Sequence, residues 1–173
     1  MIIVGGEWKC NLEVLREFNK SEGLIKHALA VEAVMRYMAR KFGGDEEKWG
    51  ITGLIHDLDY EMYPEQHCEK TEEILRERGW DEEVIRAVVS HGYGVCTDVE
   101  PVSDMEKVLY CVDELTGLVA ATALVRPSKS VMDMKAKSVR KKWKDKSFAA
   151  GVDREIVEKG AAMLGMELNE LFT

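Results

Sequence analysis

The sequence predicts an all-α fold in a single domain spanning residues 1–173. Apolar residues recur at spacings of three and four along most of the chain, which is typical of amphipathic helices. The alternation typical of strands is nearly absent. Three prolines, Pro64, Pro101 and Pro127, lie where helices are expected to start or loops to run. The length of 173 residues and the composition, 46% apolar and 32% charged, indicate one folded domain of ordinary size.

Two helices are expected before residue 58. Ser21 can cap the first of them, and one face of this helix is formed by Leu24, His27, Val31, Val34 and Met38. Gly43-Gly44 ends it, because consecutive glycines disfavour helix continuation. Asp45 or a neighbour opens the second helix, which runs through an apolar stretch to His56-Asp57.

A third and a fourth helix are expected between residues 64 and 92. The third runs from about Pro64 to Arg78 and has His67 near its start. Asp81 can cap the fourth, which ends near His91.

The second half of the chain is expected to contain further helices. Ser103 and Glu106 have the spacing of a capping box and begin a fifth helix, after the irregular stretch 92–103. A basic segment follows Pro127. A helix from Asp153 to about Met163 and helical turns at 168–171 complete the chain.

All four histidines of the chain lie on apolar helix faces or near helix ends. A lone histidine in such a place is usually a hydrogen-bonded core residue. An aspartate in a mostly apolar helix, such as Asp113, is costly to bury without a partner. Taken together, these residues form the ordered pattern H…HD…H…H…D, which is a far more specific signal than any one of them.

This pattern resembles that of the HD superfamily of metal-dependent phosphohydrolases, named for a His-Asp doublet that is His56-Asp57 here. Local matches are KHALAVEAVMRYMA, GLIHDLDY, EQHCEKTEEIL, VIRAVVSHG and LYCVDEL, and the resemblance covers about residues 21–120. It implies a bundle of about five core helices around a buried metal site. The HD core would span about residues 21–124, and a helical extension with the basic segment would span about 125–173.

The resemblance also implies the metal ligands. A first metal would be held by His27, His56, Asp57 and Asp113. His67 and His91 match the additional histidines of two-metal members, in which Asp57 would bridge the two ions. Two divalent transition metals per chain are therefore expected, chosen among Mn, Fe, Co, Ni and Zn, because imidazole and carboxylate ligands favour these ions over calcium.

The reaction implied by the resemblance is hydrolysis of a phosphoester, in a nucleotide or another small phosphorylated metabolite, by a metal-activated water. Many relatives carry a lysine three residues after the doublet's aspartate, where this chain has Tyr60. Asp59 or Glu61 could act as the general acid beside Asp57. Two alternatives stay open: a mixed-valent diiron oxygenase of the HD fold, and a non-catalytic metal-binding sensor domain.

Charge is unevenly distributed. The chain has a net charge of −8, yet the segment from Arg126 to Lys146 carries +7. This segment could bind phosphate through Lys137, Arg140 and Lys141, or it could be a solvated helix face. The acidic balance elsewhere opposes nucleic acid as the main partner.

The remaining features indicate a cytoplasmic protein without membrane partners. No apolar run approaches the ~20 residues that span a bilayer, and Met1 to Cys10 lack the pattern of a signal peptide. The four cysteines, Cys10, Cys68, Cys96 and Cys111, are scattered, as expected in a reducing compartment. Cys68 directly follows His67 but matches no ligand position of the family. The oligomeric state is not predicted.

Overall fold

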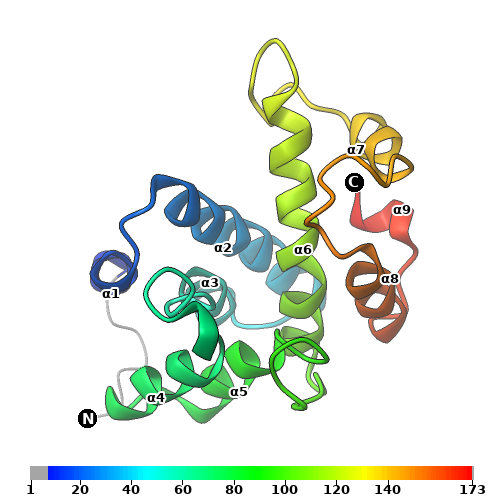
Figure 1. The fold of residues 1–173 in the computed structure, drawn as a ribbon. Helices are drawn as coiled ribbons and strands as arrows, with labels where there is room; N and C mark the ends of the chain where they lie inside the picture. Colours follow the sequence, from blue (N-terminus) through cyan, green and yellow to red (C-terminus); the bar gives the residue numbers. More distant parts are fainter. Residues whose placement is uncertain (1–7, 173) are drawn as a thin grey trace. The chain divides into compact units, whose positions relative to one another are not determined.

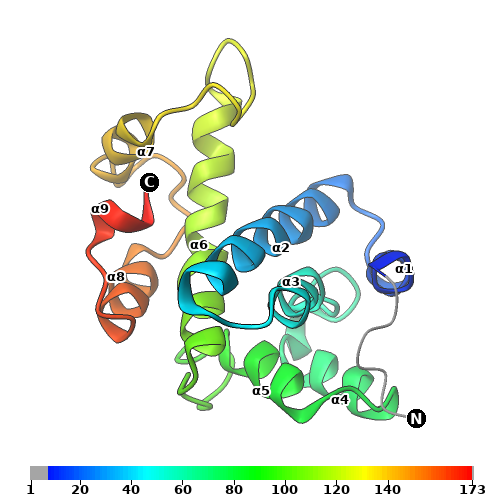
Figure 2. The ribbon, with the colours of Figure 1, turned by 180° about the vertical axis from the view of Figure 1, so that it is seen from behind.

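The computed structural model describes residues 8–172, and every regular element among them is helical. The all-α prediction is therefore confirmed. The only extended pairing in this range is a single bridge between Tyr93 and Thr97. The helices are α1 (Trp8–Phe18), α2 (Glu22–Phe42), α3 (Glu46–Ile55), α4 (Glu69–Glu77), α5 (Glu82–Ser90), α6 (Asp104–Leu124), α7 (Ala136–Trp143), α8 (Arg154–Met163) and α9 (Leu168–Leu171) (Figures 1 and 2).

Several helix ends lie where the sequence predicts them. The carboxylate of Asp45 accepts hydrogen bonds from the amides of Glu47 and Lys48 at the start of α3. Asp81 and Asp153 cap α5 and α8 in the same way. At the end of α2, Gly43 adopts a left-handed conformation with φ 71°, which costs glycine little. Local side-chain chemistry is sufficient to set these boundaries.

The expected continuous helix from Pro64 to Arg78 is wrong. A short 3₁₀ turn, η1 (Pro64–Gln66), comes first, and α4 starts only at Glu69. Between them, His67 has ψ 139° and Cys68 has φ 71°, and neither conformation is helical. His67 therefore lies in a sharp turn before α4 instead of beginning a helix.

Contacts divide the chain into two compact units, the first ending at Tyr110 and the second starting at Cys111. The division falls inside α6, some way before the end of the expected HD core near residue 124. In the first unit, α1, α2 and α5 all pack against α3 (Figures 1 and 2). Its apolar core includes Leu54, Ile55, Leu58, Leu75, Ile85 and Val88, all fully or almost fully buried.

Helix α1 has no counterpart among the sequence predictions. Leu15 on this helix is buried in the core of the first unit, and Leu12, Val14 and Phe18 pack against that core. The helix thereby covers part of the core and brings the chain to Asn19, whose side chain is also buried.

Close packing of α2 on α3 depends on a glycine. A Cβ atom at Gly53 would lie 2.8 Å from Cγ of Met35 and 3.2 Å from the backbone of Glu32. The absence of a side chain lets the two helices approach. Since α2 carries His27 and α3 leads directly into His56, this contact helps to place both residues.

The second unit has its own small core. Cys111, Leu115 and Leu118 of α6 pack there with Val139 of α7 and Val157 of α8. In the described part of the chain, no helix combines the length and the apolar character that a membrane crossing requires.

Candidate metal centre

The four histidines of the chain form a continuous row inside the first unit. The ring centroids of His27 and His56 are 5.3 Å apart, those of His56 and His91 are 5.1 Å apart, and those of His91 and His67 are 5.2 Å apart. These residues come from α2, the end of α3, the turn before α4 and the end of α5. Tertiary packing therefore brings together residues that are spread over 65 positions in the sequence.

Backbone carbonyls orient two of the imidazoles. Nδ1 of His56 lies 2.8 Å from the carbonyl oxygen of Gly53, and Nδ1 of His91 lies against the carbonyl oxygen of Val88. A carbonyl can only accept, so both Nδ1 atoms carry a proton, and Nε2 is the ring nitrogen of each histidine that can bind a metal. Metal-binding histidines are commonly oriented through such bonds.

The imidazole of His67 is oriented by a carboxylate instead of a backbone carbonyl. Its Nδ1 lies 2.8 Å from Oδ1 of Asp59, a fully buried residue. The other oxygen of Asp59 accepts the Thr71 amide at 2.8 Å, and the Asp59 amide donates to Oγ1 of Thr71 at 3.1 Å. Asp59 is thus held rigidly between the His67 ring and the first turn of α4.

The carboxylate of Asp57 faces the Nε2 atoms of these three histidines. Its Oδ1 lies 3.4 Å from Nε2 of His91 and 3.6 Å from Nε2 of His67, while Oδ2 lies 3.3 Å from Nε2 of His56. Oδ1 is buried and has no hydrogen-bond partner among the described residues. Burial opposes ionisation, but the imidazoles of His56 and His91 outweigh it and hold the pKa of Asp57 well below its ordinary value.

This arrangement fits a divalent transition metal. A buried carboxylate oxygen without a hydrogen-bond partner is costly unless a cation binds to it. One ligand atom each of His27, His56 and Asp57 lies within 4.8 Å of the others. A second group with the same spacing consists of His67, Cys68 and His91. Asp113 lies on α6 in the second unit, so its place as a fourth ligand stays a prediction.

Two residues near the site were not identified as site residues from the sequence. The buried Asn19 donates from Nδ2 to the carbonyl of Leu58 at 3.2 Å and to that of Asp57 at 3.5 Å. It thereby fixes the turn that follows the His-Asp doublet. Thr71 anchors Asp59, as described above. Neither residue gives a local signal, because its partners lie 12 or more residues away in the sequence.

The other residues predicted to take part in catalysis or binding are spread over both units. Oε2 of Glu61 accepts the amides of Lys20 and Ser21, at 2.8 and 2.9 Å, just before α2. Half-exposed Tyr60 places its ring edge-on to His67, with centroids 5.2 Å apart. Lys137, Arg140 and Lys141 lie on α7 in the second unit.

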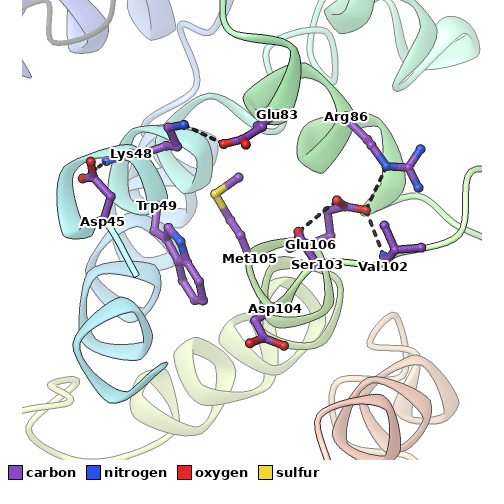
Figure 3. A pocket seen from close by; sticks show the side chains of 10 residues that line it. All are labelled: Asp45, Lys48, Trp49, Glu83, Arg86, Val102, Ser103, Asp104, Met105 and Glu106. Atoms are coloured by element: carbon purple, nitrogen blue, oxygen red, sulfur yellow. Dashed lines mark hydrogen bonds and ion pairs between the residues drawn. The ribbon is translucent and has the colours of Figure 1, made fainter. Parts of the chain in front are cut away.

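A hollow in the first unit, with a volume of about 480 Å³, contains none of the predicted ligands (Figure 3). Trp49 of α3 and Met105 of α6 are among the residues that line it. Its two cations are paired: Nζ of Lys48 lies 2.6 Å from Glu83, and Nε of Arg86 lies 3.3 Å from Glu106. These ion pairs join α3 to α5 and α5 to α6 among the residues that line the hollow, which indicates a structural role.

A family model described as the HD domain matches residues 24–117, more than half of the chain. The chain belongs to the HD domain family. Members of this family bind divalent metals and are mostly metal-dependent phosphohydrolases. No curated protein and no solved structure matches the chain in the comparisons. In this HD domain, Asp57 of the His56-Asp57 doublet lies between the two groups of candidate ligands. Its Oδ2 faces His56 of the first group, and its Oδ1 faces His67 and His91 of the second.

Proposed function

We propose that this HD domain protein hydrolyses the phosphoester of a nucleotide or another small phosphorylated metabolite, using two divalent transition metals. The supporting observation is the Asp57 carboxylate, which faces three imidazole Nε2 atoms and has one oxygen without a hydrogen-bond partner. A carboxylate with both oxygens facing ligand histidines is suited to bridging two ions. When bound, the metals supply an activated water and stabilise charge on the phosphoryl oxygens.

The protein's own contribution is to hold the ligand side chains in position for metal binding. His27, His56 and Asp57, with Asp113 as the predicted fourth ligand, would form the first metal position. His67, His91 and Asp57 would form the second. The hydrogen bonds to Nδ1 of His56, His67 and His91 keep these rings in the ligating tautomer before a metal arrives.

The contacts of Asp59 and Glu61 suggest positioning roles instead of proton donation. Both oxygens of Asp59 are engaged, one by His67 and the other by the Thr71 amide. We therefore propose that Asp59 orients His67. Glu61 accepts two backbone amides just before α2, and we propose that it anchors the helix that carries His27.

We also propose that α7 contributes to phosphate recognition. Lys137 and Lys141 are exposed on this helix, and each can offer a charged donor to a phosphate. Arg140 is partly buried, and its guanidinium lies 3.5 Å from the carbonyl of Asn169. In this proposal the two lysines contribute to substrate affinity, and Arg140 contributes mainly to packing.

A panel of phosphoesters tests the proposal. Protein reloaded separately with Mn²⁺, Fe²⁺, Co²⁺ or Ni²⁺ should hydrolyse at least one nucleotide or sugar phosphate. Asp57→Asn should reduce that activity by more than the roughly 10- to 100-fold typical of residues behind the ligands. Asp98→Asn, which changes an exposed aspartate of the same unit, should leave it unchanged.

Two results would overturn the proposal. One is the absence of turnover across the panel with every metal. The other is oxygen consumption by iron-loaded protein with a mixed-valent paramagnetic signal, which would replace hydrolysis by diiron oxygenase chemistry.

A further inference from the structure

Two thiols lie in contact beside the metal centre. The sulfur atoms of Cys68 and Cys96, 28 positions apart in the sequence, are separated by 2.6 Å. A disulfide bond is about 2.05 Å long, so the sulfurs are only about 0.6 Å further apart than bonded atoms would be. Cys68, Cys96 and Cys111 are all free thiols. The side chain of Cys10 lies outside the described part of the chain.

The backbone on both sides is shaped around this contact. Cys68 has φ 71°, a left-handed conformation that is unfavourable for a residue with a Cβ atom. Such strain persists only where the surroundings impose it, and it is enriched at functional sites. Cys96 lies in a tight turn in which the carbonyl of Gly92 accepts the amides of Val95 and Cys96, at 2.9 and 3.0 Å.

Gly92 leaves the space in which the two sulfurs meet. A Cβ atom at this position would lie 2.2 Å from Sγ of Cys96 and 2.5 Å from Sγ of Cys68. Any other residue here would have to push the thiols apart. The sulfur pair therefore depends on a glycine next to the predicted ligand His91.

The two thiols differ in accessibility. Cys68 is 1% exposed, whereas Cys96 is open to solvent. Cys111, by contrast, is buried, and burial raises its pKa to about 12. Cysteines that are oxidised reversibly are typically solvent-accessible and often lie next to a second cysteine that can form a disulfide with them.

We propose that Cys96 is a site of oxidation by hydrogen peroxide and that Cys68 resolves the oxidised form as a disulfide. In the first step, the Cys96 thiolate attacks one peroxide oxygen, which gives a sulfenic acid and releases hydroxide. Cys68 then attacks the Cys96 sulfur, so that the disulfide forms and water leaves. In total, two thiols lose two electrons and two protons, and one peroxide is reduced to two waters.

The disulfide would connect the turn after His67 with the turn after His91. One ligand atom each of His67, Cys68 and His91 lies within 4.8 Å of the others, so the oxidised pair would border the second metal position. Oxidation itself requires only the two thiols and peroxide. It can therefore be tested independently of the proposed hydrolase activity.

Thiol counting and mass spectrometry test the proposal on the full chain. After reduction and removal of the reductant, stoichiometric peroxide should lower the denatured thiol count from four to two per chain. The intact mass should fall by two hydrogens, and peptide mapping should link Cys68 to Cys96. Cys68→Ser should stop at a Cys96 sulfenic acid that dimedone traps, and Cys96→Ser should lose the disulfide.

Cys111→Ser is the matched control, because the Cys111 thiol is buried and donates to the Val157 carbonyl at 3.5 Å. This variant should still form the Cys68–Cys96 link, with a thiol count that falls from three to one. Circular dichroism of each variant before oxidation distinguishes lost chemistry from lost folding. The proposal is overturned if Cys68 and Cys96 stay reduced in folded protein, or if peptide mapping joins either one to Cys10 or Cys111 instead.

Discussion

Nδ1 of His67 lies 2.8 Å from Oδ1 of Asp59, a carboxylate whose other oxygen accepts the Thr71 amide. The pair connects a predicted metal ligand to the first turn of α4. It also explains how a histidine in a turn, outside any helix, keeps a defined orientation. Because Asp59 is fully buried and bonded on both oxygens, its contribution to metal binding can be tested directly.

Asp59→Asn should weaken binding of the second metal by roughly 10- to 100-fold, the range found for residues that orient metal-binding histidines. The amide can still accept from His67 through one oxygen, but its NH₂ group would oppose the Thr71 amide. Calorimetric titration with Zn²⁺ measures the effect on each metal position. Asp98→Asn is the control, and equal affinities in all three proteins would refute the positioning role.

The number of metals bound per chain should fall when either histidine of the second metal position is replaced. Elemental analysis of protein purified without chelator should give about two metals per chain, because Asp57 can bridge two ions. His67→Ala and His91→Ala should each reduce this to about one. A content of one metal that neither substitution changes would assign both histidines to substrate or structural roles.

The stability of the metal-free protein should depend on the protonation of His67. Burial disfavours the charged ring, but the hydrogen bond to Asp59 and the charges of Asp57 and Asp59 outweigh it and raise the pKa of His67 above 6.5. A raised folded-state pKa stabilises the protein fully below the unfolded-state pKa, and this contribution is lost as the pH rises through the folded value. Chelator-treated protein should therefore lose stability as the pH rises through that value.

Thermal unfolding at a series of pH values from about 6 to 8.5 checks this dependence. His67→Gln removes the titrating group and should flatten the curve in that range. If the wild-type and His67→Gln curves are parallel, His67 does not carry the pH dependence.

Removing the two exposed lysines of α7 should impair substrate binding and spare the metal centre. Lys137→Ala combined with Lys141→Ala should raise KM about tenfold, equivalent to ~1.4 kcal/mol, and leave kcat and metal content unchanged. Lys26→Ala with Lys41→Ala removes the same charge from exposed positions on α2. A similar KM change in both double variants would indicate a general charge effect instead of a phosphate site.

Gly53→Ala should destabilise the protein by about 1–3 kcal/mol, because the new methyl group has no room between α3 and α2. Gly23→Ala is the matched change, since its nearest neighbour would be Oγ of Ser21 at an ordinary 3.5 Å. That substitution should be neutral or stabilising by up to about 1 kcal/mol. Urea unfolding measures both, and equal effects would contradict the close contact at Gly53.

Features with local causes were predictable from the sequence. Asp45, Asp81 and Asp153 cap helices because their carboxylates reach amides two or three residues ahead. Gly43 ends α2 for an equally local reason. The turn at His67 and Cys68 was missed, because helical spacing continues through it and the strain at Cys68 arises from its surroundings.

The sequence by itself determined the all-α class, most helix starts and the ordered histidines and aspartates that mark an HD domain. Each of these follows from residue type and spacing along one segment. Only the tertiary structure decided that Asp59 supports His67, that Asn19 holds the turn after the doublet, and that Cys96 meets Cys68 beside Gly92. These contacts join residues 8 to 39 positions apart, and burial makes them specific, because a polar group removed from water must find its partner wherever the fold places it.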